Sequence, residues 1–550
     1  MNQNLFALFA SRFPADKSRV FIEGDGPGTV RRIITFAEFE ATISQYANLI
    51  LALAIAPGER VAVQTEKSPE ALMLYLACLK AGVVYVPLNS AYREGEIRYF
   101  LENAEPKLMI HAPQDEHWIG PLCTELNIAQ RYTLNEAGRG SWSIIASNAS
   151  SGLEFNSDIV PRCDDDLAAI LYTSGTTGRS KGAMITHRNL SSNALTLHQH
   201  WGFKSDDVLL HVLPLFHVHG LFVAAHTALL NAYHGGRMIF QNKFEAKAAV
   251  AALERATIFM GVPTMYTRLL AEPSFGREAC SHMRLFISGS APLLAHTFSE
   301  FQTRTGHTIL ERYGMTETGM LTSNPLVDAR KGGTVGQPLP GVTVRIATVA
   351  DADHEHVNTC FTAASLHEMG ALQVGVLQVK GPNVSPGYWR MPEKSQEEFT
   401  EDGFFKTGDL GVMDADGYIT IVGRSKDLII SGGYNIYPKE IELLIDALPG
   451  VTESAVIGLP HPDFGEAVAV VIMPNIVPNS ALGGGSKAVA AAGEVLEVMS
   501  EAHIIAVLKS KLAHFKVPKR VFIVNDLPRN AMGKIQKNVL RKQYASTFMP

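Results

Sequence analysis

Residues Leu167–Gly182 read LAAILYTSGTTGRSKG, and this stretch indicates both the fold and the chemistry of the chain. Its first five residues, Leu167–Leu171, are apolar, which is typical of a buried strand. A run of hydroxyl-bearing residues and glycines follows and leads to Lys181; it comprises Thr173, Ser174, Gly175, Thr176, Thr177 and Gly178. Glycines let the backbone approach an anion, hydroxyl and amide groups donate hydrogen bonds, and the lysine adds positive charge. The stretch therefore predicts a strand followed by a loop that binds the phosphates of a nucleotide.

Spacing excludes two common phosphate-binding loops. A P-loop requires GxxxxGK[ST], and the dinucleotide fingerprint requires GxGxxG directly after a strand. Neither spacing occurs in Leu167–Gly182, so the usual nucleotide-hydrolase and dehydrogenase interpretations lose their main support. A plain surface loop rich in serine, threonine and glycine is the remaining alternative for this stretch, because such turns are common.

Length and composition describe an ordinary globular protein of more than one domain. The chain has 550 residues, of which 46% are hydrophobic and 19% charged, and a chain of this length exceeds what one hydrophobic core usually supports. The formal net charge of −6 argues against a general nucleic-acid binder. No apolar run is long enough to span a bilayer, so no membrane partner is expected.

The ends of the chain and its cysteines favour a reducing, cytoplasmic location. Met1–Asn4 lacks the basic and apolar regions of a secretory signal. Arg12 and Arg19 leave a mitochondrial location as a weak alternative. The five widely spaced cysteines form no CxxC pair and give no sign of a zinc site; they are Cys78, Cys123, Cys163, Cys280 and Cys360.

The first half of the chain alternates helix and strand signals. Ser68 followed by Pro69 is typical of a helix start, and Gly82 of a helix end. The residues between them are apolar nearly all round, as in a helix packed under a sheet. Apolar strand-like runs recur at 83–86, 208–213, 238–240, 257–260 and 285–287. Continuous apolar strands between helices predict parallel sheets that are covered on both faces.

The pattern becomes shorter and more strand-like beyond about Val342. Strands are expected at 375–379, 411–414 and 418–422, with 414–417 as a hairpin connection. The chain changes character again near Gly423–Asp427, and the remainder has the size of one small α/β domain. Residues 351–369 and 477–492 are irregular or rich in glycine and alanine, and we interpret them as insertions at the surface.

Five further motifs follow the loop along the chain. One, SGSAPL from Ser288, closes a predicted strand at the edge where parallel sheets bind ligands. The others are ERYGMTE from Glu311, TGDLG from Thr407, with its carboxylate in a glycine-flanked turn, the basic pair Arg424 and Lys426, and PRNAMGKI, which contains Lys534.

In combination, these motifs resemble those of acyl-CoA synthetases, in the adenylate-forming superfamily that also contains firefly luciferases and the adenylation domains of peptide synthetases. The resemblance covers almost the whole chain outside the two insertions and is strongest for malonyl-CoA synthetases. It implies an α/β fold with a large N-terminal domain of two parallel-type αβα sheets and a small β-barrel-like part, residues 1–425. A small, mobile C-terminal α/β domain, residues 426–550, follows.

The resemblance implies an AMP-forming ligase that uses ATP, Mg²⁺ and coenzyme A. A carboxylate would attack the α-phosphate of ATP, and the CoA thiol would then attack the resulting acyl-adenylate. Besides the loop residues and Lys181, the implied ATP-binding residues are Gly289, Ser290, Ala291, Glu311, Arg312, Tyr313, Gly314, Met315, Thr316, Asp409, Arg424 and Lys534. Glu317 would ligate Mg²⁺, a hard cation that prefers oxygen donors. Asp409 would accept both ribose hydroxyls, because a carboxylate has two acceptor oxygens.

Catalysis and domain motion are assigned by the same resemblance. Lys534, Thr316, Glu317, His217 and Lys181 are the implied catalytic residues. Lys534 would stabilise the negative charge that accumulates on the α-phosphorus during attack. Lys426 would be the hinge about which the small domain rotates between the two half-reactions. CoA would pass the loop of Ser431, Gly432, Gly433 and Tyr434 and meet the basic residues Lys516 and Arg520, although a solvated basic face explains those two nearly as well.

The resemblance also points to the acid. A dicarboxylate substrate needs a cation in the acyl pocket, because an unpaired buried carboxylate is very costly. Arg268 matches the arginine of malonyl-CoA synthetases; Arg284 is its rival, and an exposed helix residue is the plain alternative for Arg268. Ser288 or Ser290 would donate a further hydrogen bond, and His217 would stand at the pocket entrance.

Alternative functions are a short- or medium-chain fatty acyl-CoA synthetase, a ligase that prefers methylmalonate, an adenylation domain that loads a carrier protein, and a degenerate nucleotide-binding module. The degenerate module is disfavoured because Lys181, Glu317, Asp409 and Lys534 are all present. No carrier-protein signature follows Lys534. The expected partners are therefore small molecules only, and the expected state is a monomer or weak homo-oligomer.

Overall fold

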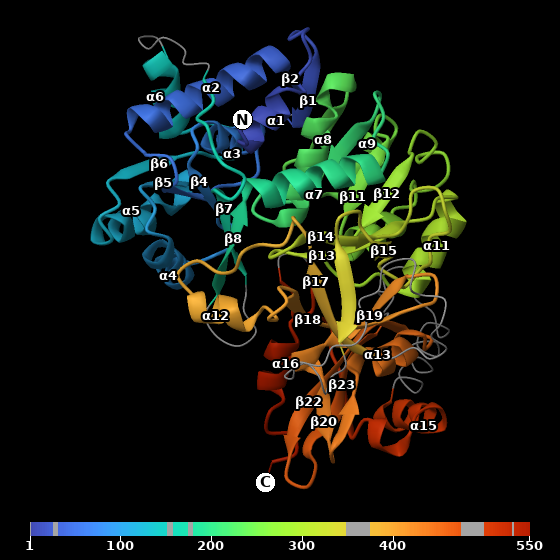
Figure 1. Cartoon of the computed structure of the whole chain (residues 1–550). Coiled ribbons are helices and arrows are strands. Elements are labelled where there is room, and N and C mark those ends of the chain that lie inside the picture. Colours follow the sequence, from blue (N-terminus) through green and yellow to red (C-terminus); the bar gives the residue numbers. More distant parts are fainter. Residues whose placement is uncertain are drawn as a thin grey trace, which may run out of the picture. The chain divides into compact units, whose positions relative to one another are not determined.

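The computed structural model describes residues 2–25, 31–150, 158–173, 180–347, 374–474, 500–530 and 533–549. The two predicted insertions, 351–369 and 477–492, therefore lie outside the described residues. The chain divides into two compact units (Figure 1). One comprises 1–293, 297–343 and 379–405, and the other comprises 294–296, 344–378 and 406–550. The predicted domain boundary at 425 concerns which residues move together, and it stays a prediction.

The first unit contains a nine-stranded and a six-stranded sheet. In spatial order, the larger sheet consists of β15 (Gln337–Pro338), β14 (Gly319–Ser323), β13 (Leu310–Met315), β12 (Leu285–Ser288), β11 (Ile258–Gly261), β9 (Val208–His211), β10 (Arg237–Phe240), β1 (Val20–Asp25) and β2 (Arg31–Thr35). The smaller consists of β6 (Gln130–Thr133), β5 (Leu108–His111), β3 (Arg60–Gln64), β4 (Val84–Pro87), β7 (Leu167–Thr173) and β8 (Lys181–Thr186). Strands β13 through β1 along the first sheet, and β6 through β7 along the second, are parallel. The predicted α/β fold with two parallel-type sheets is confirmed.

Helices connect these strands, as the alternating sequence pattern predicts. They are α1 (Leu5–Ala10), α2 (Phe36–Ala52), α3 (Pro69–Lys80), α4 (Glu94–Ala104), α5 (Glu116–Glu125), α6 (Ser141–Ser150), α7 (His187–His200), α8 (His226–Leu230), α9 (Ala246–Leu253), α10 (Pro263–Ala271), α11 (Ala295–Thr305) and α12 (Pro392–Glu397). Helix α3 shows why local signals suffice here. The Ser68 side chain caps it by accepting from the Ala71 N–H, and Gly82 follows it with φ 71°. All of its residues are buried, as predicted for a helix under a sheet.

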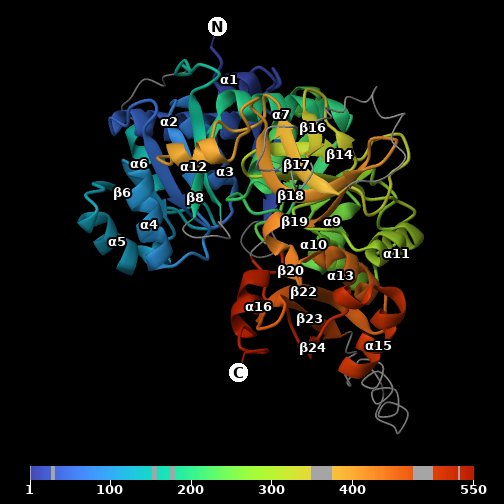
Figure 2. The same ribbon diagram turned by 60° about the horizontal axis from the view of Figure 1, so that its bottom comes forward.

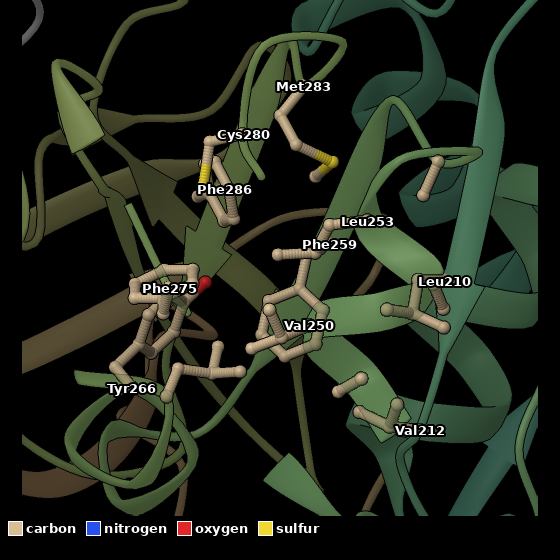
Figure 3. Close-up of a cluster of buried hydrophobic side chains, with 14 of the residues drawn as sticks. Leu210, Val212, Val250, Leu253, Phe259, Tyr266, Phe275, Cys280, Met283 and Phe286 are labelled. Atoms are coloured by element: carbon tan, nitrogen blue, oxygen red, sulfur yellow. The ribbon is translucent and has the colours of Figure 1, made fainter. Parts of the chain in front are cut away.

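The core of the nine-stranded sheet combines aliphatic and aromatic side chains (Figure 3). Phe259 of β11 and Phe286 of β12 pack against Tyr266 of α10. Val250 and Leu253 of α9 belong to the same cluster. Burial of such large apolar surfaces fixes α9 and α10 on the sheet and so sets the positions of the strand ends.

The second unit contains two smaller sheets. The first runs β16 (Thr343–Ala347), β17 (Gly375–Lys380), β18 (Phe405–Met413) and β19 (Ile419–Arg424), which is the β-rich part expected beyond Val342. The second comprises β21 (Tyr434–Ile436), β20 (Ile429–Ser431), β23 (Gly465–Pro474), β22 (Val451–His461) and β24 (Arg520–Ile523). Helices α13 (Pro438–Asp446) and α16 (Lys537–Gln543) pack on β22, and α15 (Glu501–Lys511) packs on β24 (Figure 2). The small C-terminal α/β fold is thus confirmed.

Within the described residues, no helix has the length and apolar character needed to cross a membrane.

Candidate active site

The β7–β8 hairpin positions the two ends of the predicted phosphate loop. Thr173 and Lys181 are cross-strand partners, and the Thr173 hydroxyl lies 3.4 Å from the Lys181 carbonyl oxygen. The loop residues Ser174, Gly175, Thr176, Thr177 and Gly178 lie outside the described residues. Their binding of phosphate stays a prediction, whereas the expected strand before them is confirmed as β7.

Lys181 projects from the start of β8 toward a carboxylate and an aromatic ring. Its Nζ lies 2.9 Å from Glu398 Oε1 and 4.1 Å from the centroid of the Tyr388 ring. Glu398 directly follows helix α12. A cation on an aromatic face is attracted by the negative face of the ring, so Lys181 is held from two sides.

Glu317 lies in the turn between β13 and β14, and its side chain is buried. Its Oε1 accepts a hydrogen bond of 2.9 Å from the Tyr388 hydroxyl. Burial, with the nearby carboxylates of Glu317 and Glu398, raises the pKa of Tyr388, so the hydroxyl keeps its proton and stays a donor.

Residues 382–389, here named the Tyr388 segment, connect this turn to β8. Ser385 N–H donates to the Glu317 carbonyl at 2.8 Å, and Trp389 N–H donates to the Gly182 carbonyl at 2.8 Å. Met184 N–H donates to the Gly387 carbonyl at 2.9 Å. The segment therefore links the lysine end of the phosphate hairpin with the turn that carries Glu317.

Glu317 fits the ligand role that the sequence predicted for Mg²⁺. Mg²⁺ is commonly bound by one or two carboxylates together with substrate phosphates and water, and Glu317 offers a buried carboxylate that a second side chain orients. The described residues contain no group of three or more His, Cys, Asp or Glu side chains that could hold a metal by themselves.

Arg312, on β13, is a buried charge of the first unit. Its side chain is 3% exposed, and neither Nε nor Nη2 has a hydrogen-bond partner among the described residues. The guanidinium lies against Gly289, where a β-carbon would overlap it. Burial lowers the pKa of Arg312 to about 9. Because an unpaired buried cation is costly, such a group indicates a site for an anion.

Two histidines border the same region. His219 is buried, its Nδ1 lies 3.3 Å from Ser290 Oγ, and its Nε2 has no partner among the described residues. Burial and the Arg312 charge lower the pKa of His219 well below its usual value and that of His217 to about 4. Both rings are therefore neutral at physiological pH and act as hydrogen-bonding groups rather than as cations.

The backbone around these histidines is irregular. His219 begins a π-helix, His219–Ala225, and a β-carbon at Gly220 would overlap the Pro214 carbonyl. π-helical turns occur frequently at functional sites. Ser290, opposite His219, has φ 74°, which is unfavourable for a residue with a side chain and is often found where a site constrains the backbone.

The serine motif SGSAPL closes β12 at the carboxyl edge of the parallel sheet, as predicted. Ser288 is buried, and its Oγ has no partner among the described residues. Gly289, Ser290 and Ala291 follow directly. Ser288, Arg312 and His219 each carry a buried polar atom without a partner among the described residues, and Ser288 and Arg312 lie on neighbouring strands near the edge where such sheets bind ligands.

The sequence offered two arginines for binding the second carboxylate of a dicarboxylate substrate, and they have different surroundings. Arg268 is exposed near the end of α10. Arg284 forms a two-pronged ion pair with buried Asp207, with distances of 3.0 Å and 2.5 Å. Arg284 is therefore already committed to a structural pair, whereas the role of Arg268 stays a prediction.

The remaining ERYGMTE residues line the end of β13. Glu311 is buried and accepts a hydrogen bond of 3.0 Å from Gly333 N–H. Burial raises the pKa of Glu311 to about 8. Tyr313, Gly314, Met315 and Thr316 are half-buried. The ATP-binding roles predicted for these residues stay predictions.

In the second unit, three predicted site residues come together. Asp409 and Arg424 are cross-strand partners, and Arg424 Nε lies 2.8 Å from Asp409 Oδ1. Both groups also shift the pKa of Lys534: the Arg424 guanidinium lowers it and the Asp409 carboxylate raises it. The sequence placed Asp409 in a glycine-flanked turn, and this was wrong: Asp409 lies within β18, because Phe405–Met413 pairs with β19.

Lys534 sits in a short turn that Asn530 closes. Asn530 N–H donates to the Lys534 carbonyl, and Lys534 N–H donates to Asn530 Oδ1, each at 3.0 Å. Burial and the Arg424 charge lower the pKa of Lys534 to about 8, and Asp409 and Asp427 partly oppose this shift.

The predicted hinge and CoA residues occupy surface turns of the second unit. Lys426 lies in the 3₁₀ turn Ser425–Asp427 between β19 and β20. Gly432 and Gly433 form the β20–β21 turn, after Ser431, with positive φ at both. Tyr434 is exposed and stacks on Phe515.

The basic residues proposed to meet CoA are engaged by acids of the same unit. Lys516 Nζ lies 2.7 Å from Glu440, and Arg520 lies 3.3 Å from Glu501. These ion pairs reduce the positive charge that the sequence alone suggested. The CoA role of Lys516 and Arg520 stays a prediction.

Sequence reasoning missed Tyr388 and Glu398. Each acts through a contact with a residue far away along the chain, and no short-range pattern reports such contacts. The only local sign is Gly387, whose φ of 134° turns the backbone just before Tyr388.

Comparison with known proteins identifies the family. The model for AMP-binding enzymes matches residues 6–389, and that for the C-terminal domain of AMP-binding enzymes matches residues 440–534. The chain is 35% identical to a malonate–CoA ligase of Arabidopsis thaliana over 88% of this chain and 78% of that protein. It is 33% identical to a feruloyl-CoA synthase of Amycolatopsis sp over 93% of this chain and 94% of that one.

A solved structure supports the same relationship over the full length. The crystal structure of ATP-bound MatB from Rhodopseudomonas palustris is 48% identical in sequence, covers 100% of both chains, and has a TM-score of 0.87. From the two matching domains, the relatives and the shared fold, this chain belongs to the family of AMP-binding enzymes.

Proposed function

We propose that this protein is a malonate–CoA ligase, which converts ATP, malonate and CoA into AMP, diphosphate and malonyl-CoA. Relatives named malonate–CoA ligases and a structural neighbour that binds ATP support this proposal. Identity alone does not select the acid, because a feruloyl-CoA synthase is almost equally similar. The choice of acid rests on the site.

The observation that carries the choice is the buried guanidinium of Arg312, whose Nε and Nη2 have no hydrogen-bond partner in the part of the chain that the structure describes. Malonate keeps a second carboxylate while the first one reacts, and this carboxylate needs a cation when it leaves water. A guanidinium presents its donors in a fork that matches a carboxylate. A fatty acyl chain would leave the same donors unpaired, which costs about 1–3 kcal/mol or more.

In the first half-reaction, a malonate oxygen forms a bond to the α-phosphorus of ATP. The bond from that phosphorus to the bridging oxygen breaks, and diphosphate leaves with the electron pair. The loop that ends at Lys181 would hold the departing phosphates, and Glu317 would hold Mg²⁺. When bound, Mg²⁺ supplies positive charge beside the phosphate oxygens.

Lys534 would act in the same half-reaction by approaching the α-phosphate and the attacking carboxylate, while Asp409 and Arg424 would bind the ribose. The ion pair between Asp409 and Arg424 supports this assignment, and so do the opposite effects of these two charges on the pKa of Lys534. In the second half-reaction, the CoA sulfur attacks the carbonyl carbon and AMP leaves. A rotation about Lys426 would exchange Lys534 for the Gly432–Gly433 turn between the two steps.

A panel of acids tests the proposal. Diphosphate release with ATP, Mg²⁺ and CoA is measured for malonate, methylmalonate and hexanoate, and we expect malonate to have the highest kcat/KM. Hexanoate as the best substrate would refute the choice of acid. Methylmalonate as the best would reassign the protein to the ligase alternative that prefers it.

Two variants identify the responsible arginine. Arg312→Gln is expected to lower kcat/KM for malonate at least a hundredfold, since a hydrogen bond to a charged group contributes about 1.5–3 kcal/mol and two are lost. The value for hexanoate should fall much less. Arg268→Gln is the matched comparison: if it, rather than Arg312→Gln, removes the preference for malonate, the distal carboxylate is bound by Arg268.

A further inference from the structure

Tyr388 contacts two candidate functional groups that come from separate parts of the chain. Its hydroxyl donates to Glu317 Oε1 at 2.9 Å, and its ring face lies 4.1 Å from Lys181 Nζ. The side chain is 3% exposed, so these contacts are made in the interior of the first unit rather than at its surface. One side chain thus meets both the carboxylate expected to hold Mg²⁺ and the lysine expected to meet the phosphates.

Tyr388 is itself held firmly. Its N–H donates to Ser395 Oγ at 2.8 Å, and its backbone forms an isolated bridge with Ala183 of β8. On either side of it, Ser385 and Trp389 bond to the Glu317 turn and to β8. These contacts fix the backbone at Tyr388, so the ring and its hydroxyl reach their two partners from a defined position.

We propose that Tyr388 is a positioning residue, which sets the Glu317 carboxylate and the Lys181 ammonium at a fixed separation to receive one magnesium-bound polyphosphate. The proposal rests on the proposed function, because it requires that ATP and Mg²⁺ bind here. Side chains that hydrogen-bond to a metal ligand orient that ligand, and their loss typically lowers metal affinity 10–100-fold. The aromatic face adds a second, separable contact to the lysine.

The two contacts are separated by two substitutions. Tyr388→Phe removes the hydroxyl and keeps the ring, so it breaks only the contact with Glu317. Tyr388→Leu removes both, while the ion pair between Lys181 and Glu398 remains available. Tyr132→Phe is the control. Tyr132 is half-buried, and its hydroxyl donates to Gln130 Oε1. It lies on β6, at the edge of the six-stranded sheet opposite to β8, so the loss of its hydroxyl tests the effect of the substitution away from Glu317 and Lys181.

The readout is ATP binding by calorimetry, once with saturating Mg²⁺ and once with EDTA, with thermal unfolding measured beside it. Tyr388→Phe is expected to leave the affinity in EDTA within about twofold of the wild type and to reduce the gain in affinity from Mg²⁺ at least tenfold. Tyr388→Leu should show the same loss and, in addition, bind ATP about threefold more weakly in EDTA. Tyr132→Phe should match the wild type in both conditions.

Each contrary outcome has a distinct meaning. Equal losses with and without Mg²⁺ in Tyr388→Phe would show a merely structural role and overturn the inference, as would an unchanged gain from Mg²⁺. If the wild type itself bound no ATP, or bound it without any effect of Mg²⁺, the proposed function would fall together with the inference. If Mg²⁺ strengthens ATP binding by the wild type and does so equally in both Tyr388 variants, the inference about Tyr388 is refuted and the proposed function stands.

Discussion

The lowered pKa of Lys534 predicts how adenylate formation depends on pH. An exposed lysine titrates near 10.5, but burial and the Arg424 charge bring Lys534 to about 8. Only the protonated form can stabilise negative charge at the α-phosphate. With a pKa of about 8, the protonated fraction is about 0.9 at pH 7 and about 0.1 at pH 9. The rate of adenylate formation should therefore fall about tenfold between these pH values.

The assay isolates the first half-reaction. Diphosphate release is followed from pH 6.5 to 9.5 in single turnovers without CoA, at saturating ATP, Mg²⁺ and malonate. Lys534→Arg supplies the comparison, because a guanidinium stays charged throughout this range. The variant will be slower, since its geometry differs, but its profile should lack the inflection near pH 8. Thioester formation from supplied malonyl-adenylate should not follow the inflection in either protein.

Two outcomes would refute this reasoning. A wild-type profile that stays flat to pH 9.5 would mean that Lys534 keeps an ordinary lysine pKa or does not act in this step. An inflection near pH 8 that persists unchanged in Lys534→Arg would assign the titration to another group.

Two further predictions concern the buried charges of β13. Glu311 holds a proton in the folded state between about pH 4.5 and 8 that the unfolded chain has lost, so wild-type stability should fall across this window by up to about 1.4 kcal/mol per pH unit. Thermal unfolding of Glu311→Gln should show a flatter dependence on pH, and equal slopes would contradict the assignment. Gly289→Ala should displace the Arg312 guanidinium that lies against it and lower kcat/KM for malonate more than for hexanoate. Equal losses in the acid panel would show that the guanidinium does not bind substrate.

Local signals in the sequence predicted the elements well. The cap at Ser68, the proline after it and the glycine at 82 define α3, because each acts within a few residues of the helix end. The apolar run at 167–171 predicted β7 for the same reason, since a strand buried between helices is apolar throughout.

Predictions that depend on which strands pair with each other were weaker. The glycines of TGDLG suggested a turn, but pairing with β19 draws Asp409 into an extended strand, and the positive φ of Gly408 only distorts it. Side-chain contacts of Tyr388 and the burial of Arg312 arise from tertiary packing, which no local pattern encodes.

The buried guanidinium of Arg312 has a consequence for the amount of protein as well as for its specificity. A buried guanidinium with two nitrogens that lack partners among the described residues makes the empty protein less stable, and an acid that pairs with it shifts the folding equilibrium by mass action. Small changes in stability alter the fraction of a protein that cellular quality control removes. The supply of the dicarboxylic acid would thus govern how long each molecule survives, so that the enzyme accumulates where its substrate is present.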